Sequence, residues 1–165
     1  MVSLSDVPQC NSGAPLPVVV ADEGNLVLAY VVNEPDPNWD GTYATAIDPS
    51  TPGLLFAIVT FQHPRAHFSG PPNDEAFSGH PLHARGLRPY AAFEVENSSW
   101  VRALEHMNRV HPNHSPRLFT DLKHFIFAFH DSVFECIARG YSVTLHRCSR
   151  HAIHSLMLEH LRRVS

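Results

Sequence analysis

Residues 124–146 read HFIFAFHDSVFECIARGYSVTLH, and this stretch decides the fold. As one straight strand it would place Phe129 on the same face as Glu135, because alternate residues of a strand share a face. Turns at residues 131–132 and 139–140 would separate the aromatic side chains from the acidic one. The stretch therefore predicts a three-strand antiparallel meander.

The predicted meander has one aromatic face. Its first turn pairs Phe129 with Phe134 and Phe127 with Cys136, and its second turn pairs Phe134 with Leu145. A slip of one residue would move these side chains to the solvent face, so the apolar pattern favours this register. A thiol buried among phenylalanines would be inert, because burial disfavours the thiolate.

The opposite face of the meander carries the candidate functional residues. His130 and His146 flank Val133 there, with Glu135 one step along the strand. Two imidazoles and a carboxylate could bind Fe(II), Zn(II) or Mn(II), or act as an acid–base pair without a metal, with Asp131 orienting His130. The pattern predicts His130, Asp131 and Glu135 as catalytic residues and His130, His146 and Glu135 as metal ligands. The alternative is an ordinary solvated sheet face, where polar residues are common.

Apolar residues at helical spacing predict one helix before the meander in the sequence and one helix after it. The first covers about residues 99–111, is capped by Ser98 or Ser99, and ends before Pro112. The second covers about residues 149–163. We expect both helices to pack on the aromatic face of the meander.

The N-terminal third adds further strands. The apolar runs at residues 18–20 and 26–32 predict a hairpin, and residues 54–61 are apolar enough for a strand buried on both faces. Strands and helices are not arranged as alternating units, so the fold class is α+β with a mostly antiparallel sheet. Residues 1–165 fit a single domain, because no linker or internal repeat divides them.

The segment 62–88 is rich in proline and glycine and contains four histidines: His63, His67, His80 and His83. A connection of this length is uncommon in a compact domain and usually has a function or lacks order. As a lid over the polar face of the meander, it would bring a histidine or an acidic residue to the patch of His130, Glu135 and His146. As the alternative, it is a surface excursion stiffened by its prolines.

Composition excludes several classes of protein. No apolar run approaches the roughly 20 residues that span a bilayer, and residues 1–17 lack the pattern of a signal peptide. The three cysteines form no C-x-x-C pair, which favours reduced thiols and a cytoplasmic protein. A net charge of −4 without a basic stripe argues against nucleic-acid binding. Phosphate-binding glycine loops and the nucleophile-elbow motif are absent from the sequence.

The 13 histidines suggest a function but do not specify one. The leading interpretation is a small intracellular enzyme or small-molecule-binding protein with a histidine–carboxylate pocket that uses a divalent metal or none. The alternative is a non-catalytic interaction or regulatory module, because seven acidic residues precede the first basic residue, Arg65. A third interpretation is a binder that responds to pH through its imidazoles. Codon bias would also explain the histidines, since arginine outnumbers lysine by eleven to one.

Overall fold

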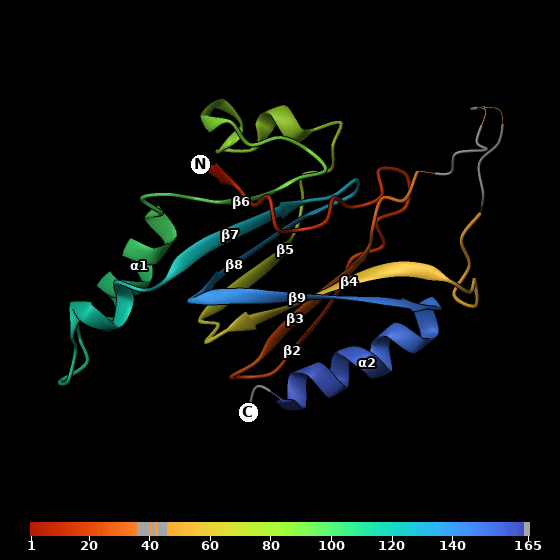
Figure 1. The fold of residues 1–165 in the computed structure, drawn as a ribbon. Coiled ribbons are helices and arrows are strands. Elements are labelled where there is room, and N and C mark those ends of the chain that lie inside the picture. Colours follow the sequence, from red (N-terminus) through yellow and green to blue (C-terminus); the bar gives the residue numbers. More distant parts are fainter. Residues whose placement is uncertain (36–39, 41, 43–45, 164–165) are drawn as a thin grey trace.

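The computed structural model describes residues 1–35, 40, 42 and 46–163. These residues form an α+β fold in which every strand pairing is antiparallel, as the sequence predicts (Figure 1). The elements, in chain order, are β1 (Val2–Ser3), β2 (Val18–Ala21), β3 (Leu26–Val31), β4 (Leu54–Gln62), β5 (Ala66–Gly70), η1 (Phe77–Gly79), η2 (His83–Arg85), β6 (Ala92–Glu94), α1 (Ser99–Asn108), η3 (Pro116–Phe119), β7 (Lys123–Ala128), β8 (Val133–Ala138), β9 (Gly140–Cys148) and α2 (Arg150–Arg163). None of the described helices is long and apolar enough to cross a membrane.

The strands form two sheets that pack face to face. The first has the order β1-β6-β7-β8-β5 and the second has the order β2-β3-β4-β9. The main core lies between them and combines alternate residues of β3 and β4 with the phenylalanines of β7 and β8. The other residues of β3 and β4 point to the outer face of the second sheet, where they pack against α2. Strands buried on both faces explain the nearly continuous apolar runs in this part of the sequence.

The β7–β8 hairpin has the predicted faces in a different register. Phe127 pairs with Phe134, a shift of two residues from the predicted partner Cys136. The turn lies at His130 and Asp131, where the Phe129 N–H donates to the carbonyl oxygen of Ser132 (2.9 Å). A shift of two residues leaves every side chain on its original face, which is why the aromatic face is right although the pairing is not.

The predicted pairing of the third strand is wrong. β9 pairs with β4 of the second sheet, so Leu145 lies opposite Ala57 instead of Phe134. Arg139 alone separates β8 from β9, and its N–H donates to the carbonyl oxygen of Gln62 (2.8 Å), so the chain passes into the other sheet without reversing. Gly140, which the sequence analysis placed in a turn, is a strand residue without the left-handed conformation that tight hairpin turns use.

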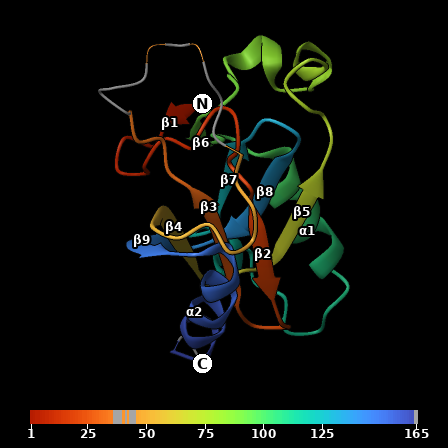
Figure 2. The ribbon, with the colours of Figure 1, turned by 90° about the vertical axis from the view of Figure 1, so that its right-hand side faces the viewer.

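The helices form where the sequence predicts them, but they do not share a face. The phenylalanine face of the first sheet is covered by the second sheet, not by helices. α2 packs Ile153 and Met157 against the far side of the second sheet (Figure 2). α1 lies by the outer face of the first sheet, where Trp100 meets the ring of His124 edge-on with centroids 5.3 Å apart.

Residues 71–91, which we call the cover lobe, pack on the outer face of the first sheet. The lobe contains η1 and η2 and forms a second core, in which Phe77 and Leu87 contact Ile126 and Val133. Most of the predicted irregular segment 62–88 is therefore ordered, and its first part forms β5. The cover lobe and α1 thus lie on the same outer face of the first sheet.

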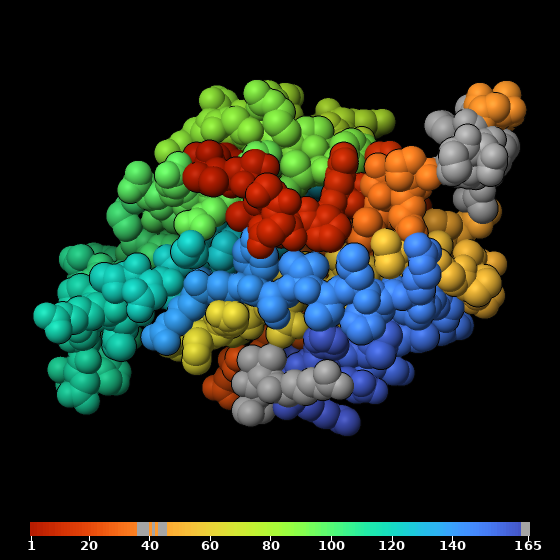
Figure 3. Space-filling view, viewed as in Figure 1, coloured from red at the N-terminus to blue at the C-terminus, as the bar shows by residue number. Residues whose placement is uncertain are grey.

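The N-terminal segment joins the two sheets along one side of the sandwich. The Leu4 N–H donates to the carbonyl oxygen of Ala92 in the first sheet (3.0 Å). The Asn11 N–H donates to the carbonyl oxygen of Val31 in the second sheet (2.8 Å). Figure 3 shows this segment in red, between the green cover lobe and the blue β9. It thereby covers one side of the core between the sheets.

Candidate functional site

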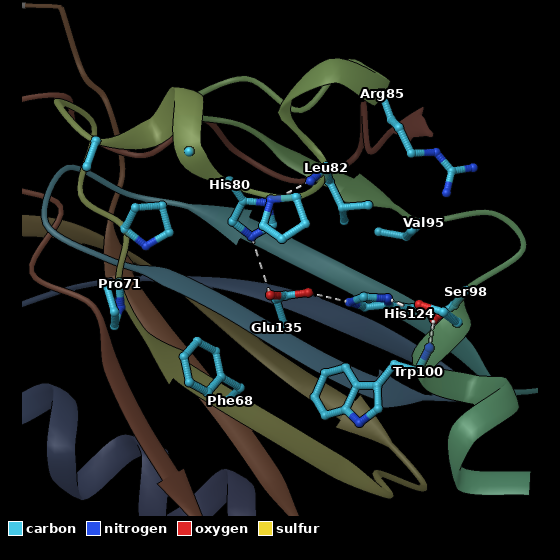
Figure 4. A pocket seen from close by; sticks show the side chains of 15 residues that line it. Phe68, Pro71, His80, Leu82, Arg85, Val95, Ser98, Trp100, His124 and Glu135 are labelled. Atoms are coloured by element: carbon cyan, nitrogen blue, oxygen red, sulfur yellow. Dashed lines mark hydrogen bonds and ion pairs between the residues drawn. The ribbon is translucent and has the colours of Figure 1, made fainter. Parts of the chain in front are cut away.

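A pocket of about 760 Å³ lies on the outer face of the first sheet, between the cover lobe and the start of α1 (Figure 4). Its volume falls within the range of about 300–1,000 Å³ that is usual for small-molecule sites. Apolar side chains form most of its walls: Phe68, Pro71, Pro72, Pro81, Leu82, Val95 and Trp100. Such walls favour a ligand with an apolar body.

Six polar side chains line the pocket, and four of them form a connected row, which we call the polar row: His80, Glu135, His124 and Ser98. The other two are Ser99 and Arg85. Figure 4 shows the members of the polar row side by side in that order. They come from the cover lobe, β8, β7 and the N-cap of α1, so residues far apart in the sequence meet here. All four carry groups that can donate or accept protons or hydrogen bonds.

Glu135 is the centre of the polar row. The β7–β8 register pairs Ile126 with Glu135, so His124 is a diagonal neighbour on the same face of the sheet. The Nε2 atom of His124 lies 2.7 Å from Oε2 of Glu135, and Nε2 of His80 lies 3.6 Å from Oε1. The side chain of Glu135 is 16% exposed, and those of the two histidines are 6–7% exposed. A carboxylate is thus held between two buried imidazoles.

The surrounding hydrogen bonds fix the tautomers of both histidines. The Leu82 N–H donates to Nδ1 of His80 (3.1 Å), which leaves the proton of the neutral ring on Nε2. The Ser98 hydroxyl oxygen accepts the N–H groups of Trp100 and Val101 (both 3.2 Å), so its own proton is free to point at Nδ1 of His124 (2.9 Å). Both neutral imidazoles therefore direct an Nε2–H toward Glu135.

The environment of Glu135 favours its ionised form. Burial acts to raise the pKa of this carboxyl, but the hydrogen bond from His124 and the electrostatic attraction of His124 and His80 outweigh it. The net effect is a pKa below the ordinary range of a glutamate. The pocket therefore offers a carboxylate at neutral pH.

The predicted residues His130 and Asp131 lie at the β7–β8 turn, outside this pocket. Nδ1 of His130 is 2.8 Å from Oδ1 of Asp131, and Nε2 is 3.9 Å from Oδ2 of Asp74 in the cover lobe. The hydrogen bond with Asp131 raises the pKa of His130, and the charge of Asp74 adds to this effect. Tyr90 donates a hydrogen bond to Asp74. This cluster ties one end of the cover lobe to the hairpin turn.

The structure does not bring the three predicted metal ligands together. His146 lies on β9 in the other sheet, where Nε2 is 3.1 Å from the Thr144 hydroxyl and the ring lies against His160. Glu135 contacts His80 and His124 instead of His130 or His146. Within the described part of the chain, no group of three or more His, Cys, Asp or Glu side chains is suited to hold a metal ion. A divalent metal in this protein stays a prediction.

Of the predicted site residues, Glu135 lines the pocket, but the residues that contact it are not the predicted ones. The predicted register placed the turn one residue too late, which put His130 rather than His124 near Glu135. The expectation that the 62–88 segment supplies a histidine agrees with the position of His80. Ser98 was recognised only as a helix cap, because no local motif connects it to a histidine 26 residues later.

Comparison of the chain with protein families, with curated proteins and with solved structures found no match.

Proposed function

We propose that this protein binds an apolar small molecule that carries a hydroxyl or amine group. The apolar walls contact the body of the ligand, and its polar group donates a hydrogen bond to Glu135. The observation that carries the proposal is the carboxyl group of Glu135 held between two histidines inside an apolar pocket, where its pKa is lowered. This arrangement matches a histidine–carboxylate pocket of an enzyme or a small-molecule-binding protein.

Packing alone does not require a carboxylate at this position. Val133 and Ile137, which flank Glu135 on the same face of β8, are fully buried, so an apolar residue would suit the fold. Moving a carboxylate out of water costs several kcal/mol unless hydrogen bonds compensate. The two imidazoles use two of about four acceptor positions on the carboxylate, which leaves positions for a ligand.

The fluorescence of Trp100 tests the proposal directly. The chain has two tryptophans, so Trp39→Phe leaves Trp100, in the pocket wall, as the single reporter. We expect 2-naphthol to change this fluorescence in a saturable way. Glu135→Gln should weaken its binding about tenfold, which corresponds to about 1.4 kcal/mol. Binding of 2-methylnaphthalene, which lacks the hydroxyl group, should be weaker and insensitive to the variant.

Glu94→Gln is the matched control. Glu94 lies in the same sheet and pairs with Lys123 (2.9 Å), but it does not line the pocket. Its substitution should leave the affinity for 2-naphthol unchanged. Equal binding of both naphthalene compounds, or equal effects of the two glutamine variants, would contradict the proposal.

A further inference from the structure

Ser98 occupies an unusual position for a helix cap. Its hydroxyl lies 2.9 Å from Nδ1 of His124, and the other nitrogen of that ring lies 2.7 Å from a carboxylate oxygen of Glu135. Serine, histidine and an acidic residue in such a chain form the arrangement that activates a hydroxyl as a nucleophile. As a helix cap, Ser98 only has to accept hydrogen bonds from two N–H groups of α1. Contact with a histidine is not part of that role.

We propose that Ser98, His124 and Glu135 form a triad that hydrolyses carboxylic esters of apolar alcohols or phenols. This inference rests on the proposed pocket, because the alcohol part of the ester is the ligand class assigned there. The acyl carbon would lie at Ser98, and the apolar groups would contact Trp100 and the proline-rich wall.

The first step forms a bond between Oγ of Ser98 and the acyl carbon. The hydroxyl proton moves to Nδ1 of His124, and the π electrons of the carbonyl group move to its oxygen. Glu135 stabilises the resulting imidazolium through Nε2–H. The bond between the acyl carbon and the alkoxy oxygen then breaks, and Nδ1 returns the proton to the leaving alcohol.

A water molecule completes the reaction. It attacks the acyl carbon of the Ser98 ester, gives its proton to Nδ1 of His124, and the acid leaves as Ser98 recovers its hydrogen. The sum is one ester and one water converted to one acid and one alcohol, with no change in oxidation state. No other reactant is required.

The start of α1 favours the negative charge that develops during this reaction. The Ser99 N–H has no acceptor among the residues that the structure describes and is available to the carbonyl oxygen of the substrate. The positive end of the helix dipole adds to this effect.

Covalent labelling with a biotinylated ethoxy fluorophosphonate tests the role of Ser98. We expect one adduct per chain, located on Ser98 by peptide fragmentation. Ser98→Asn retains an N-capping side chain but lacks the hydroxyl, and should abolish labelling. Ser149→Asn is the matched control, because Ser149 caps α2 through the Ala152 N–H (3.3 Å) and lies outside the pocket. Its labelling should equal that of the wild type.

Hydrolysis of 2-naphthyl butyrate tests the complete triad. Ser98→Asn and His124→Gln should lower kcat by at least about 10³-fold, as removal of a nucleophile or its base does. Glu135 is a positioning residue, since it acts through His124. Glu135→Gln should lower kcat by about 10²–10⁴-fold and leave KM within about twofold, because the ester donates no hydrogen bond to it.

The outcomes separate this inference from the proposed pocket. No adduct on the folded wild type, or labelling that persists in Ser98→Asn, overturns the triad. If 2-naphthol still changes Trp100 fluorescence in that case, the pocket stands without the triad. If 2-naphthol also fails to bind, both proposals fall.

Discussion

Glu135 links the stability of the protein to pH. Its pKa is lowered in the folded state, so its charge stabilises the fold at pH values above the ordinary carboxyl pKa of about 4.3. That contribution is lost as the pH falls through the lower folded pKa. The groups that face the carboxylate are His80 and His124.

We predict that Glu135→Gln lowers the free energy of unfolding by about 1–3 kcal/mol at pH 7. The substitution weakens the buried interactions of this side chain with His124 and His80. The difference from the wild type should persist down to about pH 5 and shrink below about pH 4.5. Urea denaturation at pH 7, 5, 4 and 3 measures it. A difference that does not change over this range would contradict the lowered pKa of Glu135.

His130 shows the opposite dependence. Its pKa is raised, so its charged form is favoured in the folded state below about pH 6.5 and this preference is lost as the pH rises through the raised value. The first cause is the hydrogen bond with Asp131, and the charge of Asp74 contributes less.

We predict that Asp131→Asn lowers the pKa of His130 more than Asp74→Asn does. Proton NMR titration of the imidazole signal measures both changes. Asp131 is 87% exposed, so its substitution should leave the fold intact. A larger effect of Asp74→Asn would mean that the distant charge, not the hydrogen bond, controls His130.

At the scale of the elements, alternation of apolar and polar residues predicted the faces of β7 and β8, and spacing predicted both helices. Neither pattern determines which strand lies beside another. β8 and β9 are separated by Arg139 alone, yet they belong to different sheets, because β8 pairs with β5 and β9 pairs with β4. The polar row was beyond sequence analysis for the same reason, since its members meet only through these long-range pairings.

Gly140 and Gly86 compare a glycine in a strand at the β8–β9 junction with a glycine in a left-handed conformation. Gly140 is a strand residue, and an added Cβ would meet only the flexible end of Gln62, at 3.0 Å. Gly86 has a φ of 100°, which other residues rarely adopt. We predict that Gly140→Ala costs less than about 1 kcal/mol of unfolding free energy and that Gly86→Ala costs more, because a left-handed conformation penalises alanine. Urea denaturation compares the two, and a larger cost at Gly140 would indicate a glycine-dependent turn there.

At the scale of the whole molecule, the chain passes directly from a strand of one sheet to a strand of the other at two places. β4 continues into β5, and β8 into β9, so each long ribbon contributes to both halves of the sandwich. The pocket lies on the outer face of the first sheet, but the strands that carry its residues are packed against the core between the sheets. A structure connected in this way favours the single domain that the sequence predicts.

We predict one cooperative unfolding transition. Far-ultraviolet circular dichroism and the fluorescence of Trp100 in Trp39→Phe should give the same midpoint in urea, because neither sheet keeps its core without the other. Phe61→Ala, in the core between the sheets, should shift both midpoints together and cost about 3–5 kcal/mol. Two separate midpoints would mean that the sheets unfold independently.

The pairing of β4 with β9 also has a consequence during synthesis. Residue 54 lies opposite residue 148, so β4 is synthesised early but cannot pair with β9 until β9 has been synthesised. At about 5–20 residues per second, the ribosome takes several seconds to supply β9 and then α2. Until then the edge of β4 and the apolar face that Ile153 and Met157 later cover are unprotected. A nascent chain stalled after β8 already contains Ser98, His124 and Glu135, yet it should be a substrate for chaperones and not a working pocket.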